Sequence, residues 1–412
     1  MVETICGDVL EWCASYDGPK FHAMLCDPPY ELGFMGRSWD RSGIAFRPET
    51  WAALSEHLLP GAFCFAFAST RGLHRMMVAI EDAGFVIHPM LVWVFGSGFP
   101  KATRIKDAPA FEGHRYGLQA LKPSLEPVVC FQKPYRGKLL DSIVEFGSGA
   151  LNIEGGRVPT SDDLNGGAYV EIGGRVVPPG DLREGSDLGM YQPGKTVGTS
   201  FEQPSGRWPA NLILDEESGR VLDGQSGVSK LSPSVRCNNT LGDGVKYGKS
   251  KPYETSGHSD SGGASRFFHS VNWALEDAEP FFYTAKASRA ERDAGLSVDK
   301  QLRLDDSHAG RKEALDNPFI RGKSEMRNNH PTVKPLSLSR HLATLLLPPA
   351  LYAPRRLLNP FAGSHSEAIG AMLAGWEHVT AIEMDPSYCE IGRQRVAHHA
   401  PLLSDYDLFG EA

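Results

Sequence analysis

The strongest constraint on the fold is the alternation of short apolar runs with segments of helical spacing near the start of the chain. Four apolar runs predict buried strands, at residues 24–26, 63–68, 86–95 and 128–132. Residues 50–59 and 71–83 carry apolar side chains at helical spacing and end near Gly61 and Gly84, as helices often do. Strands and helices in alternation predict a parallel α/β sheet.

The C-terminal segment from residue 330 repeats this alternation. A helix is predicted for "PLSLSRHLATLLLPP", where a pair of prolines stops it. A strand, a loop and a helix are predicted for "RRLLNPFAGSHSEAIGAMLAGW", and a strand, an acidic turn and a helix for "HVTAIEMDPSYCEIGRQRV". Pro386 suits the first turn of that last helix. The two ends of the chain are therefore expected to build one sheet.

The middle of the chain has a different composition, rich in Gly, Ser, Asn and Pro. We expect four segments: an N-terminal sheet part at 1–135, a loop-rich insertion at 136–290, a charged connection at 291–329 and a C-terminal sheet part at 330–412. The insertion is predicted to carry aromatic and basic contacts rather than to act as a passive tether. The charged connection is predicted to be mobile, with a partly exposed helix.

Charge and cysteine content exclude few functions. The formal net charge of −8 argues against a globally basic nucleic-acid binder, although a local basic cleft can coexist with it. The seven cysteines form no Cys-x-x-Cys pair, so we expect reduced thiols and no metal site. No basic leader followed by an apolar run and no long uncharged apolar run occurs, which predicts a cytoplasmic protein without a membrane segment.

The stretch "LCDPPY" at 25–30 combines an acid, two prolines and an aromatic ring. Asp27 ends a predicted strand, and the carboxyl edge of a parallel sheet is where α/β proteins bind ligands. Pro28 and Pro29 donate no backbone N–H, which leaves local carbonyl oxygens free to accept, and Tyr30 offers a flat face for stacking. This set fits an amino group on an aromatic base. A simple turn explains it equally well.

A second pattern lies in "LLNPFAGSHSEAIGA", where a strand runs through a loop of small residues into a helix N-terminus. A nucleotide-like cofactor can approach the backbone closely at such a place. The next strand, "VTAIEMD", ends with Glu383, which suits both hydroxyls of a ribose. Together these features indicate an adenosine-containing cofactor. The dinucleotide fingerprint is absent.

Taken together, "DPPY", "NPFAGSHSEAIGA", "AIEMD" and "HPTVKP" resemble the amino-methyltransferases of DNA, and their order resembles the permuted beta class. Phrases such as "DPPYELGFMGRSWD" and "YTAKASRAER" are similar to stand-alone site-specific methylases of phages and prophages. The resemblance implies a class I, Rossmann-like S-adenosylmethionine-dependent methyltransferase fold with circularly permuted motifs and an inserted target-recognition region. It also implies double-stranded DNA as the partner and a homodimer.

The resemblance also implies roles for individual residues. Asp27 and the Pro28 carbonyl would accept hydrogen bonds from the target amino group, and Tyr30 would stack on a base flipped out of the duplex. Glu383 would hold the cofactor's ribose. The other predicted cofactor residues are Asp8, Thr332, Lys334, Asn359, Phe361, Ala362, Gly363, Ser364 and Asp385. Asp8 is as consistent with a helix N-cap, and the "HPTVKP" residues with a plain turn before a helix.

One position departs from the family pattern. Relatives carry Gly at the end of the cofactor loop, where this chain has His365. A side chain there would crowd the cofactor's methionine or require an unusual backbone angle.

Candidate DNA contacts are basic and aromatic residues in three places. They are Arg37, Trp39 and Arg41 after the catalytic motif, Lys101, Arg104 and Lys106 in "PKATRIKD", and Arg207 and Trp208 together with "SRFFHS" at 265–270. For the first set the alternative is a solvated loop with one buried Trp, and for the second it is an ordinary exposed patch. We predict N6-adenine methylation, because Asp at the first motif position is typical of adenine enzymes. The alternatives are an N4-cytosine enzyme and an inactive DNA-binding descendant.

Overall fold

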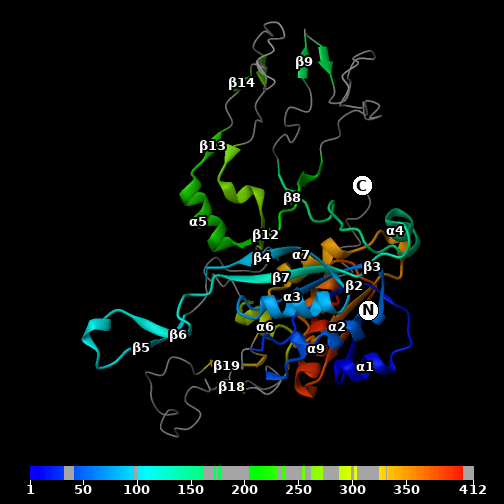
Figure 1. Ribbon diagram of the computed structural model, residues 1–412, viewed down its shortest axis with the longest axis vertical. Helices are drawn as coiled ribbons and strands as arrows, with labels where there is room; N and C mark the ends of the chain where they lie inside the picture. The colour runs from blue at the N-terminus through cyan, green and yellow to red at the C-terminus, as the bar shows by residue number, and fades with distance from the viewer. Residues whose placement is uncertain are drawn as a thin grey trace. The chain divides into compact units, whose positions relative to one another are not determined.

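The computed structural model describes residues 1–31, 41–96, 100–160, 170–172, 175–177, 204–230, 234–236, 253–255, 261–271, 287–297, 301–303, 324–330 and 332–401. The chain divides into two compact units (Figure 1). The first comprises residues 1–156, 210–218 and 270–412, and the second comprises residues 157–209 and 219–269.

A nine-stranded sheet forms the first unit, in the order β1-β21-β20-β2-β3-β7-β4-β12-β17. Its strands are β1 (Val2–Cys6), β2 (Phe21–Cys26), β3 (Leu58–Phe67), β4 (Val86–Val94), β7 (Leu125–Gln132), β12 (Leu212–Asp215), β17 (His269–Val271), β20 (Arg356–Pro360) and β21 (His378–Glu383). Its helices are α1 (Val9–Ser15), α2 (Pro48–Glu56), α3 (Leu73–Asp82), α4 (Leu139–Phe146), α6 (Arg289–Asp293), α7 (Leu336–Leu346), α8 (Ser366–Leu373) and α9 (Pro386–His399). The hairpins β5 (Lys101–Arg104) with β6 (Arg115–Gln119) and β18 (Gln301–Arg303) with β19 (Ser324–Met326) complete it.

Both ends of the chain contribute to this one sheet, as predicted. The C-terminal strand β20 lies between β21 and the N-terminal strand β2, and all three are parallel. The prediction of a wholly parallel sheet is wrong at β7, which runs antiparallel to both β3 and β4. By composition β4 and β7 could not be distinguished from parallel strands, because both are apolar runs. β7 is largely buried, whereas β4 is buried only at Leu91 and Trp93, so the prediction of a buried strand holds there only in part.

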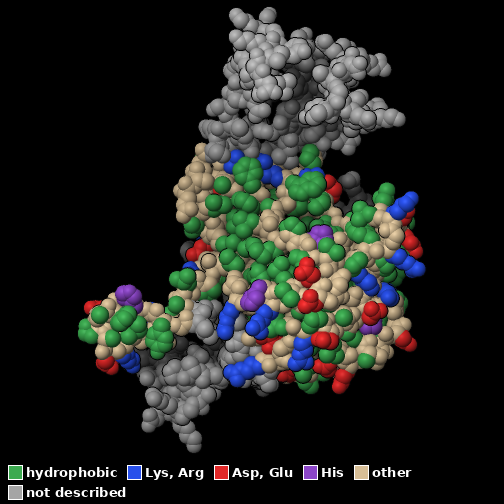
Figure 2. All heavy atoms as spheres, in the orientation of Figure 1, with side chains coloured by type: hydrophobic (Ala, Val, Ile, Leu, Met, Phe, Trp, Pro, Cys, Tyr) green, Lys and Arg blue, Asp and Glu red, His purple; other side chains and the backbone are tan. Residues whose placement is uncertain are grey.

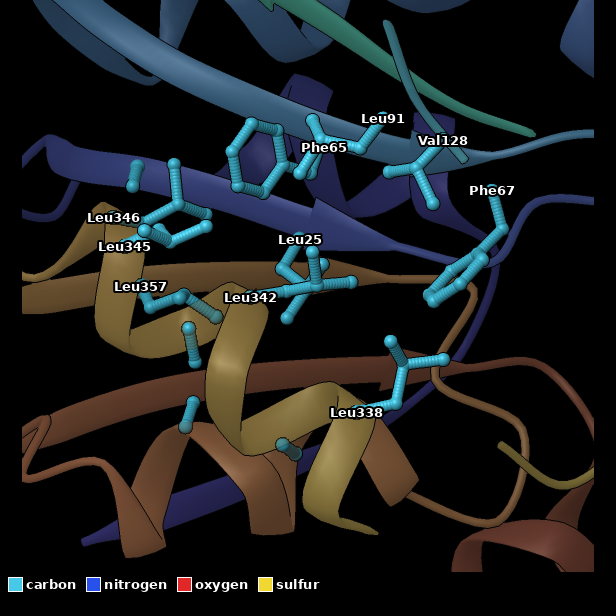
Figure 3. Close-up of a cluster of buried hydrophobic side chains, with 14 of the residues drawn as sticks. Leu25, Phe65, Phe67, Leu91, Val128, Leu338, Leu342, Leu345, Leu346 and Leu357 are labelled. Carbon is cyan, nitrogen blue, oxygen red and sulfur yellow. The ribbon is translucent and has the colours of Figure 1, made fainter. Parts of the chain in front are cut away.

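The core is divided by the sheet into two layers, following the two-residue period of the strands. On β2, Ala23 and Leu25 face one layer with α7 and α8, whereas Met24 and Cys26 face the other with α1, α2 and α3. Figure 3 shows the first layer, in which Leu338 and Leu342 of α7 pack against strand residues such as Leu25. Helices on both faces of a mostly parallel sheet confirm the predicted α/β, Rossmann-like class of fold.

The predicted helix at 50–59 ends earlier, because α2 stops at Glu56 and β3 begins at Leu58. Leu58 is fully buried and pairs with Phe21 of β2, so sheet pairing takes the last residues of the helical pattern. The other predicted strands and helices of both ends coincide with observed elements to within a few residues.

The second unit is built of short two-stranded pieces. They are β8 (Val158–Pro159) with β11 (Gly206–Arg207), β9 (Val170–Ile172) with β10 (Arg175–Val177), β13 (Ser229–Lys230) with β16 (Ser261–Gly262), and β14 (Ser234–Arg236) with β15 (Tyr253–Thr255). Helix α5 (Glu216–Ser226) begins in the first unit and continues into the second. None of the helices in the described ranges is long and apolar enough to cross a bilayer.

Candidate active site

The two sequence patterns meet at the centre of the sheet. Strand β2 ends just before Asp27, and β20 ends at Pro360, before the cofactor-type loop. These strands are parallel neighbours, with Ala23 opposite Leu357. The chain winds outward from this pair in both directions, to β21 and β1 on one side and to β3 on the other. The loops therefore lie side by side at the topological switch point, where open α/β sheets bind ligands.

Asn359 ties the two strands together across this point. Its Nδ2 donates to the Leu25 carbonyl at 2.8 Å, between residues 334 positions apart in sequence. Its side chain is fully buried, and within the described residues its Oδ1 has no hydrogen-bond partner. Asn359 was predicted to hold cofactor, and the structure assigns its amide nitrogen to the strand junction.

Asp27 has two carboxylate oxygens in different environments. Oδ2 accepts from Lys334 Nζ at 2.7 Å, whereas Oδ1 is buried and has no hydrogen-bond partner among the residues described. Burial raises the pKa of Asp27, and the nearby Lys334 ammonium opposes that rise. The unpaired oxygen is an acceptor that a ligand's N–H can use.

Lys334, which was predicted to close over the cofactor's methionine end, contacts the Asp27 carboxylate in this structure. Its Nζ lies 3.2 Å from Tyr30 Oη and 3.3 Å from Glu126 Oε2, besides Asp27. Burial alone lowers the pKa of Lys334, but the carboxylates around it raise the pKa above its ordinary value. The lysine is therefore charged. Thr332, from the same motif, is exposed.

Tyr30 is fixed by its hydroxyl group, which donates to Glu126 Oε2 at 3.1 Å. Burial, followed by the charges of Asp27 and Glu126, raises the pKa of Tyr30, so the phenol stays protonated. Its ring and Pro29 line a small pocket with Phe46, Ala68, Ser69, Gly72 and Met76. Pro28 is buried beside them. The predicted catalytic motif thus presents an acid, a fixed ring and a largely apolar wall.

The loop after β20 has an unusual backbone. Phe361, Gly363 and His365 all have positive φ angles, of 61°, 52° and 65°. Gly363 is required for a second reason besides its positive φ. A Cβ atom at this position would lie 2.7 Å from His330 Nε2, so any side chain would clash. The backbone N–H of Gly363 donates to Glu383 Oε2 at 2.8 Å, and Ala362 N–H donates to the Ile382 carbonyl. The loop is held against the end of β21.

Glu383 links the loop to the following turn, because its Oε1 accepts from Asp385 N–H at 2.8 Å. Burial raises the pKa of Glu383, and these two backbone N–H groups oppose the rise. Each carboxylate oxygen keeps a further lone pair for a ligand hydroxyl. Asp385 and Asp8 both cap helices, with Asp385 accepting from Ser387 N–H and Asp8 from Leu10 and Glu11 N–H. For Asp8 the N-cap alternative is therefore observed.

His365 does not crowd the loop with its side chain. The fully buried ring lies between Thr4 of β1 and Gly392 of α9, with Nε2 3.0 Å from Thr4 Oγ1 and Nδ1 3.2 Å from the Gly363 carbonyl. A Cβ atom on Gly392 would come within 2.2 Å of Nδ1. Because a carbonyl only accepts, Nδ1 carries the proton and Nε2 accepts from the Thr4 hydroxyl. His365 therefore replaces the family's glycine without crowding the loop. It adopts a left-handed backbone conformation, and its ring packs in the core.

Sequence analysis did not predict several buried charged residues near the loop. Arg395 of α9 is fully buried and donates to the carbonyl and hydroxyl oxygens of Ser364. Glu367 of α8 is buried, and burial followed by the Asp27 charge raises its pKa to about 7. Arginine on the apolar face of a predicted helix was the available signal for Arg395, since Tyr388, Ile391 and Arg395 share that face.

The start of the predicted charged connection is likewise integrated into the fold. Glu291 of α6 is buried, and its Oε1 accepts from Leu336 N–H at 2.6 Å, at the start of α7. Burial raises the pKa of Glu291 to about 7. Arg292 donates to the His330 carbonyl. At residues 291–297 the predicted connection is therefore held by buried contacts, because alternating charges do not reveal which of them find buried partners.

The candidate DNA contacts of the first unit are exposed where they are described. Arg41, Arg104 and Lys106 are exposed, the latter two on and after β5. Arg37 and Trp39 lie outside the described residues, as does the side chain of Lys101. Figure 2 shows Lys and Arg intermixed with Asp and Glu over the visible face of the molecule, in keeping with the negative net charge.

In the second unit the predicted residues take part in two cation–π groups. Arg207 of β11 and Arg266 lie over the ring of Phe267, at 4.7 and 4.2 Å from its centre. Arg157 lies 5.5 Å from the ring centre of Trp208, which is 65% exposed. Sequence analysis grouped Arg207 and Trp208 with residues 265–270 and did not predict Arg157. The structure brings together guanidinium groups and exposed rings, a combination typical of nucleic-acid contacts.

Comparison with known proteins supports the resemblance seen in the motifs. The chain is 31% identical over 105 residues to the Type II methyltransferase M.HindIII of Haemophilus influenzae, which is 23% of this chain and 34% of that protein. The chain thus spans about a third of the length of this curated relative. No protein-family model matches the chain.

Two solved structures match most of the chain at low overall similarity. The M1.HpyAVI–SAM complex matches 96% of this chain and 100% of its own with a TM-score of 0.39 and 12% identity. The cytosine-N4-specific PvuII DNA methyltransferase matches 96% and 86% with a TM-score of 0.38 and 10% identity. The M.HindIII match, to a protein named as a methyltransferase, agrees with the methyltransferase resemblance of the motifs.

Proposed function

We propose that this protein is a DNA methyltransferase that uses S-adenosylmethionine to methylate the exocyclic N6 of adenine in double-stranded DNA. The proposal rests on the position of Asp27. Its Oδ1 has no hydrogen-bond partner among the described residues, and Asp27 lies beside the cofactor-type loop at the topological switch point of the sheet. The M.HindIII match supports the same reaction class.

The residues around the loop fit S-adenosylmethionine. Glu383 has carboxylate lone pairs for two ribose hydroxyls, and the positive φ at Gly363 brings the backbone close to any ligand there. Phe361, Ala362 and Ser364 would surround the methionine side, with Asp8 and Asp385 at the neighbouring turns. We also assign Asn359 and Thr332 to the edge of this site. When bound, the cofactor supplies a methyl group activated by a positively charged sulfur.

The chain's own residues would act by alignment and charge. The Asp27 Oδ1 atom would accept one hydrogen of the target amino group, and the carbonyl of Pro28 would accept the other. These acceptors stabilise the positive charge that grows on the amino nitrogen as it is methylated. The ring of Tyr30, held by Glu126, would stack on the target base, which must leave the duplex to reach Asp27. No covalent intermediate with the protein is needed.

The remaining parts of the proposal concern target choice and assembly. Asp at position 27 favours adenine over cytosine, since Ser at this motif position is typical of N4-cytosine enzymes. We propose that residues 136–290 recognise the DNA sequence, with the Arg207–Phe267–Arg266 cluster and Trp208 contacting the strand. Arg37, Trp39, Arg41, Lys101 and Arg104 would contact phosphates. A homodimer remains a prediction.

The decisive experiment measures transfer of labelled methyl from S-adenosylmethionine to duplex DNA. Asp27→Ala should abolish transfer while cofactor binding is retained, whereas Asp82→Ala, an exposed acid at the end of α3, should behave as wild type. Equal transfer by wild type and Asp27→Ala would refute the role of Asp27. Modification sequencing of DNA from a methylation-free host expressing the gene would then identify the base, and N4-methylcytosine in a defined motif would contradict the adenine assignment.

A further inference from the structure

The Lys334 ammonium group lies in direct contact with the Asp27 carboxylate and can set its charge state. We infer that Lys334 is a positioning residue. Its ammonium group binds Oδ2 of Asp27, which keeps the carboxylate ionised and leaves Oδ1 directed to the substrate amino group. This inference rests on the proposed function and adds a residue that acts through Asp27.

The three donors of the ammonium group match three oxygens. Nζ lies 2.7 Å from Asp27 Oδ2, 3.2 Å from Tyr30 Oη and 3.3 Å from Glu126 Oε2. Tyr30 donates its own hydrogen to Glu126, so its oxygen is free to accept from the lysine. Nζ also lies 4.6 Å from the ring centre of Phe67. The arrangement leaves one oxygen of Asp27 without a partner among the described residues.

The balance of charge around Asp27 makes the lysine necessary. Asp27 follows β2, Glu126 lies on β7 and Glu367 on α8, and all three carboxylates act on the pKa of Lys334. Asp27 and Glu367 are both buried groups whose pKa values are raised by burial and by neighbouring acids. Without the cation, the partly buried Asp27 and Glu126 and the buried Glu367 would lose the opposing charge, and protonation of some of them would relieve the repulsion. A protonated Asp27 would donate where the substrate needs an acceptor.

A contact between Lys334 and the cofactor's methionine end is the competing role, and it makes a different kinetic prediction. Removal of a cofactor contact raises the KM for S-adenosylmethionine, whereas removal of the positioning lysine lowers kcat by reducing the ionised fraction of Asp27. In the second case kcat should recover as the pH is raised, by roughly tenfold for each unit of pKa shift. The pH profile therefore separates the two roles.

The test compares Lys334→Met, Lys334→Arg and, as a control, the exposed Lys20→Met. We expect the acidic limb of the Lys334→Met pH profile to lie at higher pH than that of wild type, with kcat reduced about tenfold for each pH unit below the new apparent pKa. Lys334→Arg should restore much of the wild-type profile because it keeps the charge. A higher KM for S-adenosylmethionine with an unchanged profile would overturn the inference.

A second measurement does not depend on turnover. In Lys334→Met the unpaired carboxylate should make thermal stability fall more steeply between pH 5 and pH 8 than in wild type, since an acid with a raised folded pKa loses stability as pH rises. Lys334→Met/Asp27→Asn should remove that extra slope. Identical slopes in the single and double variants would refute the coupling. Absence of methyl transfer by wild type would refute the proposed function instead, and the unfolding experiment would still measure the coupling.

Discussion

His365 provides the sharpest test of how the cofactor loop is built. Burial lowers the pKa of this imidazole from 6.5 to about 4 in the folded protein, with the charges of Arg395 and Arg393 acting in the same direction. Between these two values the unfolded chain binds a proton that the folded protein does not. The free energy of unfolding therefore falls as the pH is lowered through this window.

The size of the effect follows from the width of the window. Each unit of pKa difference corresponds to roughly 1.4 kcal/mol, so complete passage through the window lowers stability by about 3 kcal/mol through this residue alone. Other buried histidines also destabilise the protein in acid, among them His330 and His399, whose pKa values burial lowers to about 3 and about 4. A matched variant is therefore required.

His365→Asn is the appropriate variant. Asn tolerates a left-handed backbone and keeps a polar group near Thr4, but it does not titrate. At pH 8 we expect it to be less stable than wild type by about 1–2 kcal/mol, because a buried ring and one of its hydrogen bonds are lost. Toward pH 4 the difference should shrink or reverse, since wild type alone loses stability through this site.

The assay is urea unfolding of both proteins at several pH values from 4 to 8, followed by intrinsic fluorescence. A gap between the two stability curves that stays constant across this range would refute the assignment of a buried neutral His365. Tighter binding of S-adenosylmethionine by His365→Asn would show in addition that the ring restricts the cofactor loop, contrary to its observed place between β1 and α9.

Three further predictions concern other parts of the site. Asn359→Leu should lower the free energy of unfolding by about 1–3 kcal/mol, measured in urea, because it removes the buried donor to the Leu25 carbonyl; an unchanged midpoint would contradict that link. Asp8→Ala should cost about 1 kcal/mol through loss of the N-cap of α1, and an additional large rise in the dissociation constant for S-adenosylmethionine would reveal a direct cofactor contact. Arg266→Ala should weaken DNA binding and reduce the slope of log affinity against log salt by about one, whereas an unaltered slope would exclude a phosphate contact.

The sequence by itself determined the elements and the chemistry of the two motifs. Apolar runs and helical spacing located the strands and helices at both ends of the chain, because local periodicity follows from which face of each element is buried. Asp27 and Glu383 were found because Asp27 directly follows one buried strand and Glu383 ends another, at the sheet edge where α/β proteins bind ligands. Local sequence also supplied Arg207, Trp208 and Phe267, although not their contacts.

Only the tertiary structure decided which of these residues act together. The neighbourhood of β2 and β20, the antiparallel direction of β7, and the pairing of Lys334 with Asp27 depend on contacts between segments far apart in the chain. Local periodicity carries no information on strand direction or on the partner of a buried charge, because both are set by the sheet order. His365 is the clearest case, since its ring direction depends on the space that Thr4 and Gly392 leave in the core.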